Sequence, residues 1–129
     1  MNTKQKDIDF SALEEFLRSD CNVVFALIFG SYGAGRQKEE SDLDLAIYFE
    51  DPPEGMALFE LSNTLSDICG RDIDLVVLNN SSPLLQHQVM KNRHPLIIKD
   101  PSIYRQFRER VIVAYDEYKY ISGMSVYDR

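Results

Sequence analysis

The chain has 129 residues, of which 44% are hydrophobic and 27% charged, a composition typical of one soluble globular domain. Its formal net charge of -7 argues against non-specific binding to nucleic acid or anionic lipid, because such binding needs a cationic surface. We therefore expect no direct nucleic-acid partner and no membrane partner.

The N-terminus and the cysteines favour a cytoplasmic location. The first ten residues, MNTKQKDIDF, contain no apolar segment of the kind found in secretory signals. The longest apolar run, residues 23–29, is too short to cross a bilayer. Cys21 and Cys69 match no metal-ligand spacing and are too few for a disulfide-stabilised scaffold, so we expect two reduced thiols.

The first half of the chain predicts one helix and two strands. Apolar residues recur at helical spacing from about Ser11. Residues 22–29 (NVVFALIF) are continuously apolar and rich in β-branched side chains, which predicts a strand buried on both faces. Residues 41–49 alternate between apolar and polar, which predicts a half-buried strand with Asp42 and Asp44 on its polar face.

Proline and glycine residues mark the boundaries of the later elements. These elements are a helix from about Pro53 to Gly70, a strand over residues 71–78, a short helix opened by Pro83, an extended segment over residues 95–98, and a helix from Pro101 to about Tyr120. Alternating helices and strands predict a single α/β domain over residues 1–129, with residues from about 122 to 129 as a loose C-terminal tail.

Asp42 and Asp44 are candidate metal ligands. Residues two apart on a strand point the same way, with Cα atoms roughly 6.5 Å apart, so the two carboxylates repel each other unless a cation lies between them. Magnesium is suited to that position, because it prefers a few carboxylates together with phosphate oxygens and water. The next strand offers Asp72 and Asp74, which also share a face.

Gly30 and Ser31 are candidate phosphate-binding residues. A glycine at the end of a buried strand lets the backbone approach a ligand closely, and a serine with exposed backbone N–H groups suits a phosphate. Arg36 is a further candidate for neutralising phosphate, with a solvated loop arginine as an equal alternative. An Asp-x-Asp pair alone is more often a solvated strand end, so the combination of features carries the interpretation.

Taken together, this spacing resembles a known family. A Gly-Ser pair, ten residues and an Asp-x-Asp pair form the signature of the DNA polymerase β-like nucleotidyltransferase superfamily, matched here by Gly30–Ser31 and by Asp42 and Asp44. That superfamily takes its third carboxylate from a later strand, which Asp74 in DIDLVVL matches, with Asp72 as the rival. The C-terminal half, from SSPLLQHQVM onward, resembles the minimal nucleotidyltransferase (MNT) antitoxins that are paired with HEPN toxins.

The resemblance implies a polymerase β-like fold in which a mixed sheet is flanked by helices. It implies two Mg²⁺ ions bound by Asp42, Asp44 and Asp74, with ATP as substrate and its phosphates held at Gly30 and Ser31. It also implies transfer of AMP to a tyrosine of a HEPN ribonuclease toxin, within a hetero-oligomer of antitoxin and toxin. Tyr118 and Tyr120 are candidate contacts with that partner.

Two other functions remain open. The first is an antitoxin that neutralises its toxin by stoichiometric binding, with a dispensable transferase site. The second is a small-molecule nucleotidyltransferase of the antibiotic-modifying kind, although such enzymes are larger and carry an added helical domain.

Overall fold

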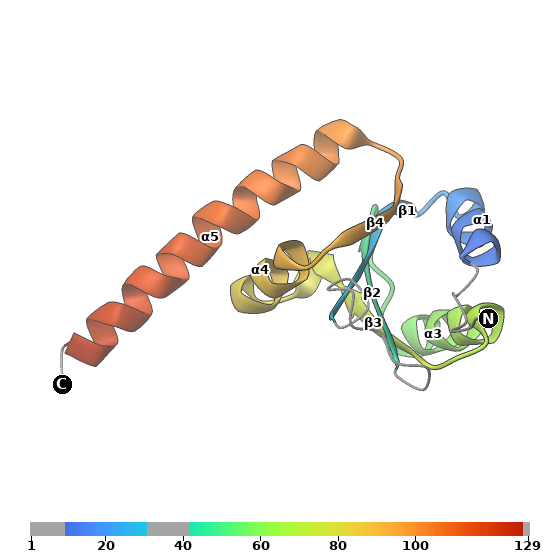
Figure 1. The fold of residues 1–129 in the computed structure, drawn as a ribbon, viewed down its shortest axis with the longest axis horizontal. Helices are drawn as coiled ribbons and strands as arrows, with labels where there is room; N and C mark the ends of the chain where they lie inside the picture. The colour runs from blue at the N-terminus through green and yellow to red at the C-terminus, as the bar shows by residue number, and fades with distance from the viewer. Residues whose placement is uncertain (1–9, 31–41, 128–129) are drawn as a thin grey trace, which may run out of the picture.

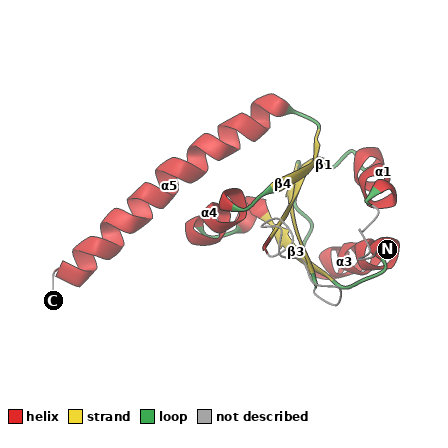
Figure 2. Ribbon diagram, in the orientation of Figure 1, coloured by secondary structure: helices red, strands yellow, loops and turns green. Residues whose placement is uncertain are grey.

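The computed structural model describes residues 10–30 and 42–127, with side chains through residue 122. Figure 2 distinguishes the helices, in red, from the strands of the sheet, in yellow. The elements are, in order, α1 (Ser11–Ser19), β1 (Val23–Phe29), β2 (Leu43–Phe49), α3 (Gly55–Cys69), β3 (Ile73–Val77), the 3-10 turn η1 (Leu78–Asn80), α4 (Pro83–Lys91), β4 (His94–Ile98) and α5 (Pro101–Tyr127). No helix in these described ranges is long and apolar enough to cross a membrane.

The four strands form one mixed sheet in the order β3-β2-β1-β4. β1 pairs antiparallel with both β2 and β4, whereas β2 and β3 pair in parallel. A parallel pair needs a crossover connection, and α3 supplies it between β2 and β3. The expected fold, a mixed sheet with flanking helices, is therefore confirmed.

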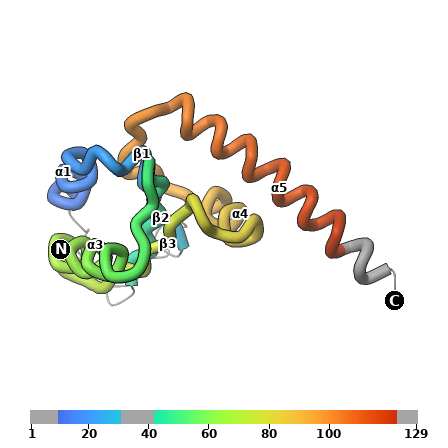
Figure 3. Tube along the Cα trace, turned by 180° about the vertical axis from the view of Figure 1, so that it is seen from behind, coloured from blue at the N-terminus to red at the C-terminus, as the bar shows by residue number. Residues whose placement is uncertain are grey.

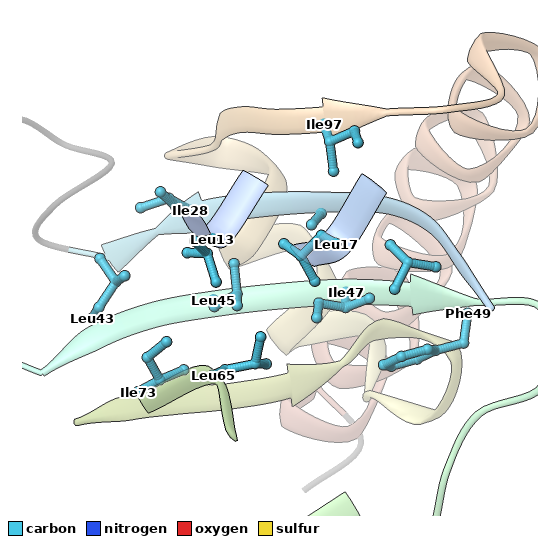
Figure 4. Packing of buried hydrophobic residues seen from close by; sticks show 12 residues of the cluster. Leu13, Leu17, Ile28, Leu43, Leu45, Ile47, Phe49, Leu65, Ile73 and Ile97 are labelled. Atoms are coloured by element: carbon cyan, nitrogen blue, oxygen red, sulfur yellow. The ribbon is translucent and has the colours of Figure 1, made fainter. Parts of the chain in front are cut away.

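Helices cover both faces of the sheet. In Figure 1, α1 and α3 lie on one side of the strands, and α4 and α5 lie on the other. Leu13 and Leu17 of α1 and Leu65 of α3 are completely buried against the first face, as Figure 4 shows. The second face packs against α4 and α5 through a cluster that includes an aromatic group, formed by Phe25, Tyr48, Tyr104 and Phe107.

β2 is more deeply buried than its alternating sequence predicts. Ala46, on the face expected to be polar, is fully buried, and Tyr48 is half-buried. The helices α4 and α5 exclude water from this face, which the alternation within β2 alone does not reveal. Asp44 and Tyr48 are the two residues of this strand that remain partly exposed.

Two helix boundaries differ from expectation. α3 begins at Gly55 rather than Pro53, because Glu54 adopts extended backbone angles (φ -137°, ψ 161°) that separate the prolines from the helix. α5 continues to Tyr127 rather than ending near Tyr120, since its last turns contain one glycine and no proline. A single helical glycine costs only about 1 kcal/mol. Figure 3, seen from behind, shows α5 extending past α4.

Candidate active site

The candidate site forms where the end of β1 meets the beginnings of β2 and β3. Phe29, the last residue of β1, pairs with Asp44 in β2. Asp44 in turn pairs in register with Asp74 in β3. Because the strands are neighbours in the order β3-β2-β1, Asp44 occupies the middle of this end of the sheet, between Asp74 and the turn that follows Phe29.

Asp44 and Asp74 lie on the same face of the sheet. The residues two positions later on the two strands, Ala46 and Val76, pack towards α4 and α5. Side chains two apart on a strand share a face. Neighbouring strands lie roughly 5 Å apart, so in-register residues bring their side chains close together. Asp72 lies before β3, is exposed, and uses its carbonyl oxygen to accept a hydrogen bond from Leu43 N at 3.0 Å.

The neighbouring carboxylates at this end of the sheet disfavour the charge of Asp44. Burial raises the pKa of Asp44 above its ordinary value of 3.8, and the negative charges of Asp74 and then Asp42 raise it further. Asp72 is not among the causes. The ionised Asp44 side chain is thus held close to two like charges, an arrangement that a bound cation would relieve.

Gly30 makes room for the Asp44 side chain. Its backbone has a φ of +72°, a left-handed conformation that glycine adopts without a steric penalty. A Cβ at this position would overlap Oδ2 of Asp44 and lie 3.0 Å from its Cγ. The sequence alone predicted a close approach to phosphate and missed this contact, because the contact depends on the pairing register of β1 and β2.

Comparison with known families identifies the fold. The family model for the polymerase β nucleotidyltransferases matches residues 11–102. The chain belongs to this nucleotidyltransferase family. The match spans all four strands and therefore includes the whole candidate site at the ends of β1, β2 and β3.

Relatives of this nucleotidyltransferase carry names from protein adenylylation. A predicted protein adenylyltransferase of Methanocaldococcus jannaschii is 38% identical over 64 residues, which are 50% of this chain and 65% of that protein. The protein adenylyltransferase MntA of Shewanella oneidensis is 38% identical over 63 residues, 49% of this chain and 45% of MntA. Each aligned segment therefore leaves a third or more of the relative unmatched.

A solved structure resembles this nucleotidyltransferase over nearly its whole length. It is the crystal structure of a toxin–antitoxin with AMP-PNP, 26% identical, with a TM-score of 0.79. The superposition covers 92% of this chain and 97% of that one. The expected resemblance to MNT antitoxins is thus confirmed at the level of fold and family.

The donor set of this nucleotidyltransferase fits a hard divalent cation. Asp42, Asp44 and Asp74 carry carboxylate oxygens, the ligand type that Mg²⁺ prefers, and Gly30 leaves space beside the Asp44 carboxylate. Within the described residues, however, no three His, Cys, Asp or Glu side chains converge closely enough to hold a metal ion alone. Repulsion among the carboxylates opposes such convergence, and Mg²⁺ sites commonly draw remaining ligands from substrate phosphates and water.

Two candidate residues lie outside the described parts of the chain. Ser31 and Arg36 fall between residues 30 and 42, so their expected roles at the phosphates stay predictions. The structure brings Gly30, Asp44 and Asp74 together and puts exposed Asp42 directly before β2. The assignment of these residues to catalysis or metal binding likewise stays a prediction.

Proposed function

We propose that this nucleotidyltransferase is an antitoxin that transfers AMP from ATP to a tyrosine of a HEPN ribonuclease toxin. The observation that carries the proposal is the in-register pair of Asp44 and Asp74, with Gly30 packed against Asp44, in a chain of this family. The names of the relatives and the AMP-PNP-bound toxin–antitoxin structure support the choice of a protein acceptor and of ATP.

The residues have separate roles in the proposed reaction. The tyrosine Oη attacks the α-phosphorus of ATP, the bond from this phosphorus to the bridging oxygen of the β-phosphate breaks, and pyrophosphate leaves. Asp74 accepts the hydroxyl proton. Gly30 and Ser31 hold the β- and γ-phosphates through backbone N–H groups and the serine hydroxyl, with Arg36 as an additional phosphate ligand.

Asp42, Asp44 and Asp74 would hold the two Mg²⁺ ions that this family resemblance implies. Bound there, the metal would neutralise phosphate charge and make the acceptor hydroxyl easier to ionise. The raised pKa of Asp44 supports this assignment, because its carboxylate lies among like charges that a cation would offset.

The test is to mix the chain with ATP, Mg²⁺ and the small all-helical protein with an Arg-x4-6-His motif that we expect from the neighbouring reading frame. Mass spectrometry of that protein should show one or more added AMP groups on a tyrosine. The Asp42→Asn, Asp44→Asn double variant should add none, whereas Asp72→Asn, a matched control on an exposed carboxylate, should retain most of the activity.

Two results would contradict the proposal. Full neutralisation of the toxin by the double variant, without added AMP, would favour an antitoxin that acts by stoichiometric binding. Modification of an aminoglycoside, with no change in the mass of the toxin, would favour a small-molecule nucleotidyltransferase.

Tyr118 and Tyr120 are 41% and 69% exposed, so they are accessible for contact with a partner, while Tyr115 stacks on His87.

A further inference from the structure

A groove runs between α4 and α5, the two helices that cover the face of the sheet bearing Asp44 and Asp74. It encloses about 470 Å³. Its lining comes from α4, the turn after it and α5, and consists of His87, Met90, Lys91, Arg93, Arg108, Val111 and Ile112. Three of these residues are cationic and none is acidic, although the chain as a whole carries a net charge of -7.

Two of the cations are held in place around one buried tyrosine. Arg93 donates from Nε to Tyr104 Oη at 2.6 Å and from Nη1 to the Met90 carbonyl oxygen at 2.8 Å. The guanidinium carbons of Arg93 and Arg108 lie 6.0 Å and 5.5 Å from the centroid of the Tyr104 ring. This arrangement orders Arg93 before any ligand arrives, which lowers the entropic cost of binding an anion.

The positive charge of the groove is not neutralised within the described chain. Among residues 10–30 and 42–122, Arg18 forms a salt bridge with Glu14, far from this groove in the sequence. Lys91, Arg93 and Arg108 form none there. Like charges gathered without a carboxylate partner favour an incoming negative group, because the groove then offers unpaired charge and free donors.

The groove also has an apolar component. Met90 and Val111 are buried beneath it, and Ile112 on its rim is 60% exposed. Exposed aliphatic side chains beside arginine and methionine are typical of the central part of protein interfaces. A small anion would use the cations and leave Ile112 in water, whereas a protein segment would use both.

We propose that this groove docks an acidic segment of the acceptor protein, with carboxylates on Lys91, Arg93 and Arg108 and an apolar side chain on Ile112. The inference rests on the proposed function, because it assigns the partner of that same reaction. Charge complementarity selects an acidic occupant, because this groove gathers three cations in a chain whose net charge is -7.

The groove adjoins the candidate active site through the sheet. Arg93 immediately precedes β4, whose first residue His94 pairs with Ile28 of β1. The next residue of β1, Phe29, pairs with Asp44. A protein docked along the groove therefore lies at the same end of the sheet as the carboxylates, close to where its tyrosine must be presented.

The test measures binding between the full chain and the HEPN protein of the previous experiment by isothermal titration calorimetry, without ATP. The Arg93→Glu, Arg108→Glu double variant should raise the Kd about 30-fold. A matched control, Arg105→Glu, Arg110→Glu, makes the same charge change on exposed residues of α5 outside this groove and should stay within about threefold of wild type.

A second variant guards against misfolding, because Arg93 supports Tyr104. Lys91→Glu, Ile112→Ser changes two exposed side chains for which the structure describes no hydrogen bond, and should raise the Kd about tenfold. An equal loss of affinity in the groove and control variants would overturn the proposal, because the loss would then come from the change in net charge alone. Wild-type affinity in both groove variants, or binding of single-stranded RNA to the groove in place of the protein, would also overturn it.

The outcomes separate docking from catalysis. Groove-dependent binding without any added AMP would support the docking site and contradict the transferase. Added AMP at the wild-type rate and acceptor KM in both groove variants would support the transferase and contradict the docking site. When both proposals hold, the groove variants raise the KM for the acceptor protein while kcat at saturation stays near wild type.

Discussion

The face of the sheet covered by α1 and α3 differs in composition from the face covered by α4 and α5. The buried residues of the first are aliphatic apart from Phe49, with Phe10, Phe16 and Cys69 packed against them. The second has an apolar middle but carries Asp44 and Asp74 at one end, with the cationic groove between its covering helices. The in-register aspartates and the cationic groove therefore both lie on the side of the sheet that α4 and α5 cover.

Adjacent side chains of β2 point to opposite faces of the sheet. Leu45 is fully buried towards α1 and α3, whereas Asp44 points to the opposite side and stays partly open. One strand thus supplies packing and candidate chemistry at alternate positions. Substitutions at neighbouring positions should consequently change stability or activity separately, and this is the comparison that the following predictions test.

The largest expected effect is on the polar face. Asp44→Asn removes the charge but keeps the shape, so AMP transfer to the toxin should fall about a thousandfold, equivalent to ~4 kcal/mol of transition-state stabilisation. The far-ultraviolet circular dichroism spectrum should be unchanged. Single-turnover assays by mass spectrometry provide the measurement, and transfer within tenfold of wild type would remove Asp44 from the proposed site.

Leu45→Ala makes the corresponding change on the aliphatic face. Truncating a fully buried leucine leaves a cavity, so the free energy of unfolding should fall by about 3 kcal/mol. Urea titration measures this, with Phe59→Ala as control, because Phe59 is 60% exposed and should change stability little. At temperatures where the variant stays folded, transfer activity should remain within a few-fold of wild type; a thousandfold loss would show that the faces are not separable.

Gly30→Ala tests the contact between the end of β1 and Asp44. It combines backbone strain at φ +72° with overlap between the new methyl group and the carboxylate, so we expect a loss of about 2 kcal/mol in stability. Gly70→Ala is the matched control, because Gly70 has a φ of +78° but nothing within 4 Å of its would-be Cβ.

The difference between these glycine variants isolates the overlap with the carboxylate. Thermal unfolding of both variants measures it, and equal destabilisation would mean that Asp44 moves aside at no cost. Adding Asp44→Ala to Gly30→Ala should restore much of the lost stability, since the methyl group then has space, but it should restore no transfer activity.

The sequence was sufficient to predict those parts of the fold that depend on local periodicity. The continuous apolar run of β1, the glycine stop at Gly70 and the proline start of α4 all carry direct chemical signals. The burial of Ala46 and the length of α5 were not predictable in this way. Burial depends on helices distant in sequence, and a lone glycine does not end a helix.

The candidate site was predictable in its members but not in its contacts. The spacing of Gly30, Asp42 and Asp44 identifies the family signature, and alternation puts the two aspartates on one face. The pairing of Asp44 with Asp74 and its contact with Gly30 required the register of three strands. The groove residues Arg93 and Arg108 were missed, because no short motif connects positions on a turn and a distant helix.

The smallest expected effect concerns the stability of the polar face without metal. Because Asp44 has a raised pKa in the folded chain, ionising it destabilises the fold at pH 7, so Asp44→Asn should increase stability in a chelator. Solvent screening limits the gain to at most about 1 kcal/mol. As pH falls below 3.8, the carboxyl is protonated in both folded and unfolded chains, and the advantage of Asn should vanish.

Magnesium should make the wild-type chain more stable than the Asp44→Asn variant, the reverse of their order of stability in a chelator. Binding to the folded state raises the Tm of wild type, because a cation offsets the repulsion among Asp42, Asp44 and Asp74. Asp44→Asn lacks one of these charges and should gain less. Differential scanning fluorimetry at pH 7, about three pH units above the ordinary pKa of an aspartate, measures both shifts with Mg²⁺ and with excess EDTA. A wild-type Tm that does not respond to Mg²⁺ would mean that the carboxylates need the nucleotide's phosphates before they can bind metal, and the same titration repeated with AMP-PNP would then have to produce the shift.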